Sequence, residues 1–142
     1  MYKGKMRIFL SFFIFLMLTL NINASYNQYS GLVERGEQSG ELINLKSANL
    51  YVRNRIERPG IYACYVDLPD LDMMNKKALC FFDHHPSNLI EAHILDFDQN
   101  IYEQPITIRL FHFIRELIDI ETEEDAIRMI ESDKNQAHKL LD

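Results

Sequence analysis

The stretch Glu91–Glu116, EAHILDFDQNIYEQPITIRLFHFIRE, decides the fold of this 142-residue chain. Apolar residues alternate with others between residues 106 and 113, which is the period of a β-strand with one buried face. Residues 89–97 are patterned as a strand as well, and residues 98–100 suit a tight reversal between the two. The residues expected on the buried face of the second strand are Ile106, Ile108 and Leu110.

Further β-patterned segments precede this stretch. Residues 61–66 are rich in strand formers and follow the turn-forming pair Pro59-Gly60. Residues 78–82 form another apolar run. Between them, residues 67–77 contain Pro69 and several polar side chains, so we expect a long hairpin loop there.

The pattern changes to a helical period near the C-terminus. Thr122 followed by Asp125 approximates a capping box, and two glutamates occupy the first turn, where the helix dipole favours anions. The apolar stripe that follows is interrupted by Asp133 and Lys134; its members are Ala126, Ile127, Ile130, Ala137, Leu140 and Leu141. Several short strands followed by one helix predict a mainly β fold, a small barrel with a helix packed outside.

The first 24 residues differ from the rest of the chain. Three basic residues precede an apolar run over residues 8–20, and Ala24 is a small residue where a signal peptidase would cleave. The run is shorter than the roughly 20 residues of a spanning helix, so we expect a signal peptide, with an uncleaved membrane anchor through residues 8–20 as the alternative. The domain would then be residues 25–142, periplasmic, secreted or anchored, and cytoplasmic only if the segment is unused.

The body of the protein is acidic. The whole chain has a formal net charge of −6, and loss of the first 24 residues, with three basic and no acidic side chains, gives 12 − 21 = −9. An acidic domain argues against nucleic acid or an anionic membrane surface as a partner.

The two cysteines, Cys64 and Cys80, lie in separate β-patterned runs. We interpret them as two small buried hydrophobic residues. A disulfide is the alternative, because two strand cysteines can pair in an oxidising compartment.

Three segments carry a resemblance to a known family. Residues 90–98, IEAHILDFD, are similar to a pattern VEVHLLDFD, and Gly60 to Ala63 is similar to a Gly-Val-Tyr-Ala strand. Downstream, Ile130, Asp133 and Ala137 match a terminal helix. Together they resemble riboflavin kinase, the C-terminal module of bifunctional bacterial enzymes, from about residue 31 to residue 141. The resemblance implies a six-stranded antiparallel Greek-key barrel with a C-terminal α-helix.

The resemblance implies transfer of the γ-phosphate of ATP to the 5′-hydroxyl of riboflavin, giving FMN and ADP. It makes Glu91 the catalytic base. On a strand through residue 97, Glu91 shares a face with His93, Leu95 and Phe97, and loss of solvation among such neighbours raises a carboxyl pKa toward the range of a general base. The pattern alone favours a solvated glutamate near a strand start, and it is the resemblance that assigns the catalytic role. The residues implied on the flavin side are Phe113, Arg115 and Glu116.

The nucleotide motif of the family, close to GRxLGFPTAN, corresponds to residues 40–49, GELINLKSAN. Ser47 and Asn49 keep a hydroxyl and an amide oxygen, which are ligands that Mg²⁺ prefers. The family's arginine has become Glu41, which opposes ATP, whereas Lys46 replaces proline and can act as a point charge toward phosphate. The implied ATP-binding residues are Gly36, Gly40, Lys46, Ser47 and Asn49, with Ser47 and Asn49 also on Mg²⁺.

A second departure lies at residues 81–87, FFDHHPS, where the family has a sequence like NIGxRPT. Two hypotheses therefore stay open. One is an active riboflavin kinase that uses ATP and Mg²⁺. The other is an exported relative with impaired catalysis that binds a flavin or another partner. We expect a monomer in both cases.

Overall fold

The computed structural model describes residues 27–35, 46–53, 58–83 and 88–142. Within these ranges the elements are β1 (Asn27–Leu32), β2 (Ala48–Tyr51), β3 (Gly60–Leu68), the 3-10 turn η2 (Pro69–Leu71), β4 (Met73–Asp83), β5 (Leu89–Ile94), β6 (Pro105–Arg115) and α2 (Glu123–Leu140). The predicted signal peptide or anchor lies outside the described residues, and so do Gly36, Gly40 and Glu41. No helix in the described part of the chain is long and apolar enough to cross a membrane.

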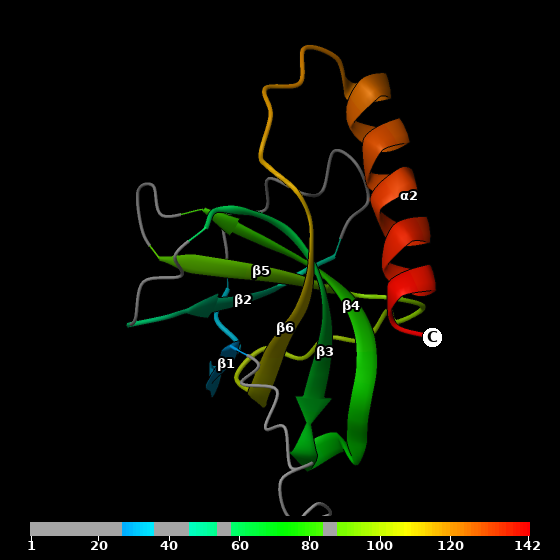
Figure 1. Cartoon of the computed structure of the whole chain (residues 1–142). Coiled ribbons are helices and arrows are strands. Elements are labelled where there is room, and N and C mark those ends of the chain that lie inside the picture. Colours follow the sequence, from blue (N-terminus) through cyan, green and yellow to red (C-terminus); the bar gives the residue numbers. More distant parts are fainter. Residues whose placement is uncertain (1–26, 36–45, 54–57, 84–87) are drawn as a thin grey trace, which may run out of the picture.

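The strands form one antiparallel sheet in the order β1-β6-β3-β4-β5-β2. Three consecutive strands, β3 to β5, lie side by side and β6 returns next to β3, which is the Greek-key arrangement. The sheet curls into a nearly closed barrel with α2 along its outside (Figure 1). One bridge joins the two edges, because the Glu34 N–H donates to the Asn49 carbonyl at 2.9 Å. The predicted Greek-key barrel with a C-terminal helix is confirmed.

Both faces of the sheet contribute to a hydrophobic cluster. The inner face fills the barrel with an apolar cluster that includes Ala48, Leu50, Val66, Phe82, Ile90, Ala92, Ile106, Ile108 and Leu110. The alternation predicted for this strand is therefore confirmed from Ile106 to Leu110, whereas the register shifts near Phe111 and leaves His112 exposed. The outer face is covered by α2 next to β3 and β4 through a second cluster, made of Ile61, Ala63, Leu79, Leu95, Ala137 and Leu141.

Helix α2 begins where the sequence predicts. The Thr122 hydroxyl accepts a hydrogen bond from the Asp125 N–H at 3.1 Å, which satisfies one of the free donors of the first turn. At the other end, the Tyr65 hydroxyl of β3 donates to the Leu141 carbonyl at 2.8 Å. The helix is thus held at its C-terminal end by the barrel as well as by its apolar stripe.

The hairpin between β3 and β4 is tighter than expected. Strand pairing continues to Leu68, and only residues 69–72 turn, so the long loop predicted over residues 67–77 is wrong. The Asp67 carboxylate stabilises this short turn: its Oδ1 accepts from the backbone N–H of Asn75 at 2.7 Å and from Arg109 Nη2 of β6 at 2.9 Å.

The connection between β5 and β6 is longer than expected. β5 ends at Ile94, and Asp96 adopts a left-handed φ of 55°, which ends strand geometry. As a result Leu95 packs under α2 while Phe97 packs against the inner cluster, so Phe97 does not share the face of Glu91. The predicted tight turn at residues 98–100 is part of a ten-residue connection, residues 95–104.

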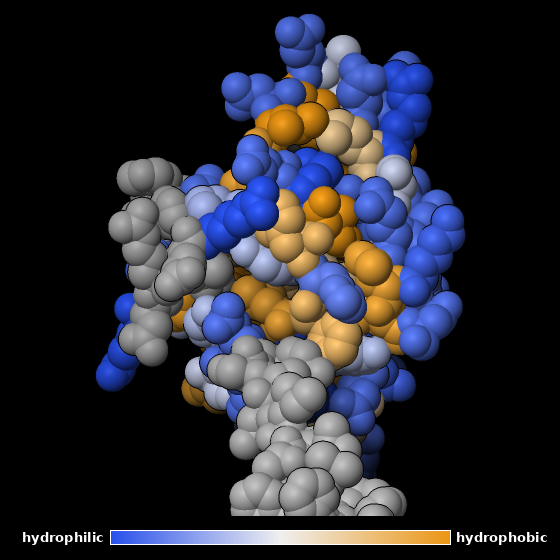
Figure 2. Space-filling view, in the orientation of Figure 1, coloured by the Kyte–Doolittle hydropathy of each residue, from blue (hydrophilic) through white to orange (hydrophobic). Residues whose placement is uncertain are grey.

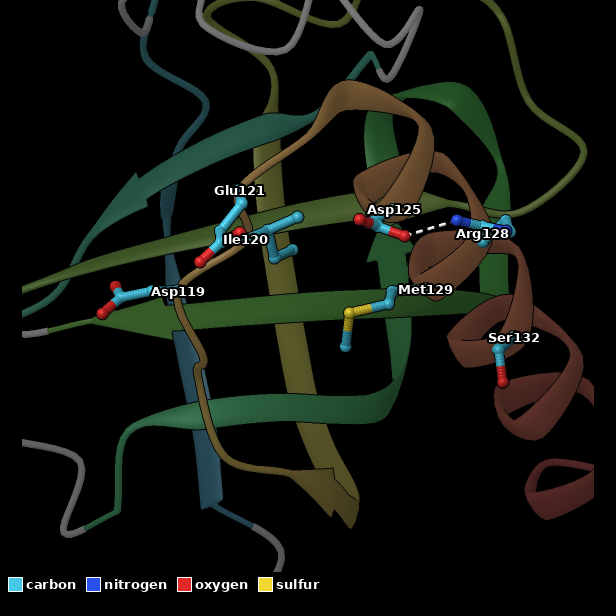
Figure 3. Close-up of a pocket in the computed structure, with 7 residues that line it drawn as sticks. All are labelled: Asp119, Ile120, Glu121, Asp125, Arg128, Met129 and Ser132. Carbon is cyan, nitrogen blue, oxygen red and sulfur yellow. Dashed lines mark hydrogen bonds and ion pairs between the residues drawn. The ribbon is translucent and has the colours of Figure 1, made fainter.

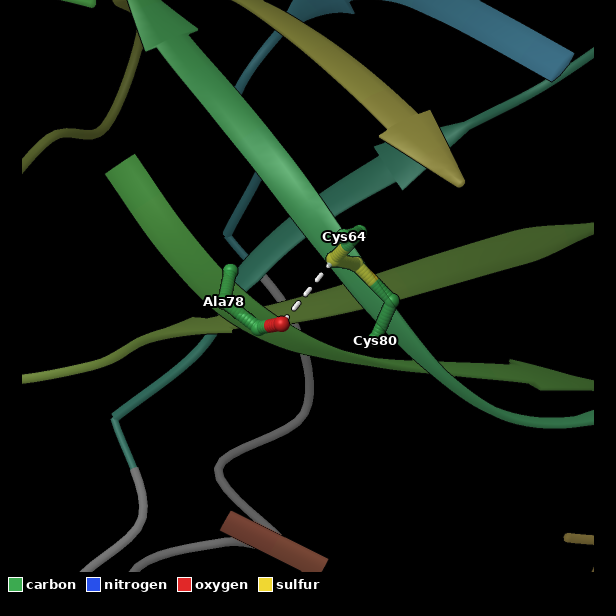
Figure 4. Close-up of a disulfide and its surroundings, with 3 residues drawn as sticks. All are labelled: Cys64, Ala78 and Cys80. Carbon is green, nitrogen blue, oxygen red and sulfur yellow. Dashed lines mark hydrogen bonds between the residues drawn. A yellow bond between two sulfur atoms is a disulfide. The ribbon is translucent and has the colours of Figure 1, made fainter. Parts of the chain in front are cut away.

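Cys64 and Cys80 form a disulfide on the inner face (Figure 4). Both residues are fully buried, and their Cα atoms are 6.4 Å apart, within the usual range for such a bridge. Cys80 lies opposite Tyr62, so the bridge runs diagonally between β3 and β4. The interpretation as two unpaired hydrophobic residues is corrected, although their predicted burial holds.

Candidate active site

One row of residues crosses the outer face of the barrel from its seam to the helix side. Its members lie opposite one another on successive strands, in the order Glu34, Asn49, Glu91, Phe81, Ile61 and Arg115. Directly opposed residues of antiparallel strands point to the same side of a sheet. The neighbours of Asn49 and Glu91 along their strands belong to the inner cluster, so this outer row faces away from the barrel interior.

Glu91 lies in the outer row as a half-buried carboxylate. Phe81, its neighbour on β4, is partly buried against the cluster under α2 and shields one side of it. This burial raises the pKa of Glu91 above its ordinary value of 4.5. None of the described residues gives the carboxylate a hydrogen bond or ion pair, so it is a stronger base than a solvated glutamate and is free to accept a proton.

Asn49 lies between Glu91 and the seam and is only 7% exposed. Its buried Oδ1 atom has no hydrogen-bond partner among the described residues. Such an orphaned oxygen costs about 1–3 kcal/mol in a folded protein and calls for a ligand or ion to satisfy it. Ser47, two residues earlier, is half-buried. An amide oxygen and a hydroxyl are hard donors, so this pair fits the divalent cation that the sequence analysis assigned to it.

The described part of the chain contains no group of three or more histidine, cysteine, aspartate or glutamate side chains placed to hold a metal. The two donors assigned to a cation at this place, Ser47 and Asn49, are both neutral oxygens. Such a set leaves coordination positions for the oxygens of a phosphate chain.

The start of β2 is held by β5. His93 Nδ1 lies 2.7 Å from the Lys46 carbonyl oxygen, and because a carbonyl only accepts, the ring nitrogen is the donor. Burial lowers the pKa of His93, which favours the neutral form of the ring. The Lys46 ammonium pairs with Asp98, with both side chains well exposed, and surface pairs of this kind are weak enough to be exchanged for a phosphate.

Phe113, Arg115 and Glu116, the residues implied on the flavin side, lie together at the end of β6. Their side chains contact other residues of the protein. Arg115 binds Asp133 of α2 through Nε at 3.0 and 3.2 Å and through Nη2 at 2.7 Å. Glu116 pairs with Arg58 at 3.0 Å, and the same guanidinium stacks 3.5 Å above the Phe113 ring. Their contact with a flavin stays a prediction, whereas the structure gives Arg115 a role in fastening α2.

A groove opens just beyond these residues, between the segment that follows β6 and α2. It has a volume of about 470 Å³ and is lined by Asp119, Ile120, Glu121, Asp125, Arg128, Met129 and Ser132 (Figure 3). Exposed apolar side chains gather on the same segment and the first turns of α2 (Figure 2); they are Leu117, Ile118, Ile120 and Ile127. The groove itself is lined mainly by charged and polar side chains, with Ile120 and Met129 as its apolar members.

The structure gives two residues of this region a place that the sequence did not reveal. Asp133 looked like an interruption of the helical stripe, but it is 2% exposed and paired with Arg115. Its spacing was a usable signal, since it lies three residues after Ile130 and four before Ala137, on the buried side. Glu34 carried no local signal, because its place depends on closure of the barrel at Asn49.

Comparison with known sequences gives a consistent set of matches. A family model described as riboflavin kinase matches residues 24–141. The chain is 32% identical over 115 residues to the trifunctional protein RibF/MnmA of Mycoplasmoides gallisepticum, covering 75% of the chain and 17% of that protein. It is 28% identical over 128 residues to the bifunctional riboflavin kinase/FMN adenylyltransferase of Haemophilus influenzae, covering 86% of the chain and 41% of that protein. The chain thus spans less than half the length of these curated relatives.

Solved structures share the fold at low identity. A macrolide-efflux protein from Streptococcus pneumoniae matches with a TM-score of 0.70 and 18% identity, over 80% of this chain and 38% of that one. Riboflavin kinase from Trypanosoma brucei matches with a TM-score of 0.61 and 16% identity, over 80% of this chain and 78% of that one. Both likenesses concern the barrel and its helix.

Proposed function

Because the chain belongs to the riboflavin kinase family, we propose that it transfers the γ-phosphate of ATP to the 5′-hydroxyl of riboflavin. One observation carries the proposal: Asn49 lies directly opposite Glu91, and among the described residues neither the Asn49 amide oxygen nor the Glu91 carboxylate has a partner. Neighbouring strands are about 4.8 Å apart, so a group that holds phosphate and a group that accepts a proton can reach one hydroxyl.

In this mechanism Glu91 removes the proton of the riboflavin 5′-hydroxyl as its oxygen attacks the γ-phosphorus. The new P–O bond forms while the bond to the β-phosphate oxygen breaks, and ADP leaves. Burial makes Glu91 the stronger base that this step needs. Most of the rate comes from holding the two reactants in line, as in other phosphoryl transfers.

Ser47 and Asn49 would hold a divalent cation, which we propose to be Mg²⁺, and bound there it would neutralise charge on the phosphate oxygens. The His93 contact with the Lys46 carbonyl fixes the chain just before these ligands. Lys46 can leave Asp98 and turn its ammonium toward a phosphate.

The flavin ring would lie in the groove between residues 117–122 and α2. The groove combines apolar side chains with polar ones, as an isoalloxazine ring requires. The Arg115–Asp133 pair joins the end of β6 to α2 next to Ser132 of the groove lining, so it keeps the two walls in register.

A second candidate is an exported relative that binds a flavin without phosphorylating it. The Cys64–Cys80 disulfide supports it, because such bridges persist in oxidising compartments, where ATP is scarce. The glutamate at position 41, in place of the family's arginine, also weakens the case for ATP binding.

One experiment separates the candidates. The purified full chain is incubated with riboflavin, ATP and Mg²⁺, and FMN is measured by chromatography, while quenching of riboflavin fluorescence reports binding. FMN formation supports the kinase. Quenching without FMN supports the binding protein. Neither FMN nor quenching, from a chain that is folded by circular dichroism, would reject both.

A further inference from the structure

Glu34 extends the outer row across the seam of the barrel. It follows β1 by two residues, and its N–H donates to the Asn49 carbonyl at 2.9 Å. Val33 is 1% exposed and belongs to the inner cluster, so the next side chain along the extended chain points outward. Because Glu34 and Asn49 are directly opposed, both side chains are on the outer face.

Nothing in the described ranges neutralises the Glu34 carboxylate. It is exposed and has no ion pair or hydrogen bond there. The adjacent cation, Arg35, lies over the ring of Tyr102, 5.2 Å from its centroid. On the other side of Asn49 the next residue of the row is Glu91, again a carboxylate. Within the part of the chain that the structure describes, two carboxylates without ion pairs therefore flank one buried amide oxygen without a hydrogen-bond partner.

We infer that Glu34 is a further ligand of the cation site, so that this chain binds a divalent cation in the absence of nucleotide. The inference rests on the proposed placement of the cation at Ser47 and Asn49. Those two donors are neutral and depend on phosphate for negative charge, whereas a carboxylate supplies that charge from the protein. Added ligand charge tightens the binding of hard cations.

The inference has a consequence for the order of binding. A cation held by Glu34 and Asn49 also lowers the repulsion between Glu34 and Glu91, so the site favours occupation before ATP arrives. The carboxylate that holds the cation repels the phosphate chain, so the nucleotide binds to the cation-loaded site and weakly to the empty one.

The test is a titration of the nucleotide-free full chain with Mn²⁺, with free Mn²⁺ followed by electron paramagnetic resonance. We expect one site per chain, and we expect Glu34→Gln to weaken it by about tenfold or more. The matched control is Glu103→Gln, which removes the same charge close by, since the Glu103 N–H donates to the carbonyl of Val33. This control should leave the affinity within about twofold of the unchanged chain. Circular dichroism checks that each variant is folded.

Two results would overturn the inference: no stoichiometric Mn²⁺ binding without nucleotide, or equal affinities for Glu34→Gln and Glu103→Gln. FMN formation is measured separately on the same preparations. A chain that makes FMN but shows either result keeps the proposed function and loses this inference. A chain that binds Mn²⁺ through Glu34 but makes no FMN keeps the inference and loses the kinase activity.

Discussion

The inner face of the barrel and the part of its outer face near the seam are built from the same strands and have opposite character. On the inner face, residues such as Ala48, Ile90 and the Cys64–Cys80 bridge are fully buried and apolar or covalently joined. On the outer face, Asn49 and Glu91 keep polar atoms without partners in the described structure. Alternate residues of one strand thus serve stability and chemistry separately, so changes in the outer row should affect activity more than folding.

Glu91→Gln should have the largest effect, and it tests whether the outer row carries the chemistry. Loss of a general base usually slows a reaction by about 10²–10⁴-fold, and the amide has nearly the same shape, so FMN formation should fall by that factor while riboflavin still quenches. Turnover is measured by chromatography of FMN. Glu131→Gln, on the exposed side of α2, is the control and should turn over normally. An unchanged rate for Glu91→Gln would show that the outer row does not contain the base.

Asp133→Ala tests the exception within the outer row, its end at Arg115. In the Arg115–Asp133 ion pair the aspartate is buried. Removing it leaves the Arg115 charge uncompensated, which costs about 3 kcal/mol or more of folding stability. Urea unfolding followed by circular dichroism measures the loss. Glu131→Gln breaks an exposed pair with Lys134 on the same helix and should cost less than about 0.5 kcal/mol.

The double change Asp133→Leu with Arg115→Met sharpens the interpretation. It removes both charges, so most of the stability lost in Asp133→Ala should return. If the double variant is as unstable as Asp133→Ala, the loss does not come from an uncompensated charge. The specific hydrogen bonds between Arg115 and Asp133 would then be what stabilises the attachment of α2.

On the inner face, replacing both Cys64 and Cys80 by alanine should lower stability by about 2–3 kcal/mol, because the open chain regains the entropy of a loop of this length. FMN formation per folded molecule should be unchanged. Urea unfolding with and without reductant measures the effect, since reductant should destabilise only the unchanged chain. If the unchanged chain has the same urea midpoint with and without reductant, the disulfide does not contribute to stability.

The sequence predicted those features that depend on local pattern. Alternation from Ile106 to Leu110 and the Thr122 cap needed only neighbours along the chain, and both hold in the structure. The features it missed depend on partners far away: Asp133 is a buried ion pair only because Arg115 meets it, and Glu34 joins the row only because the barrel closes. The positive φ of Asp96, which ends β5 early, likewise leaves no trace in the hydrophobic pattern of the sequence.

His93→Ala should have a smaller effect, on substrate binding more than on chemistry. Loss of the hydrogen bond to the Lys46 carbonyl is worth about 1 kcal/mol, which corresponds to a several-fold rise in KM for ATP with little change in kcat. His93→Asn can restore a donor and should recover part of the affinity. A fall in kcat without a change in KM would mean that His93 acts in the chemical step and not by holding the start of β2 in place.

The smallest expected effect is on stability, and its sign is the sharpest test of Glu91. Burial raises its folded-state pKa above 4.5, so protonation stabilises the folded chain; this contribution is complete below the ordinary pKa and is lost as pH rises through the folded pKa. Glu91→Gln cannot ionise, so it should be about as stable as the unchanged chain near pH 4.5 and more stable at neutral pH. Urea midpoints of both chains across this range measure the difference. A variant less stable at neutral pH would mean that the ionised carboxylate has a partner that stabilises it, and the outer row would then contribute to folding as the inner face does.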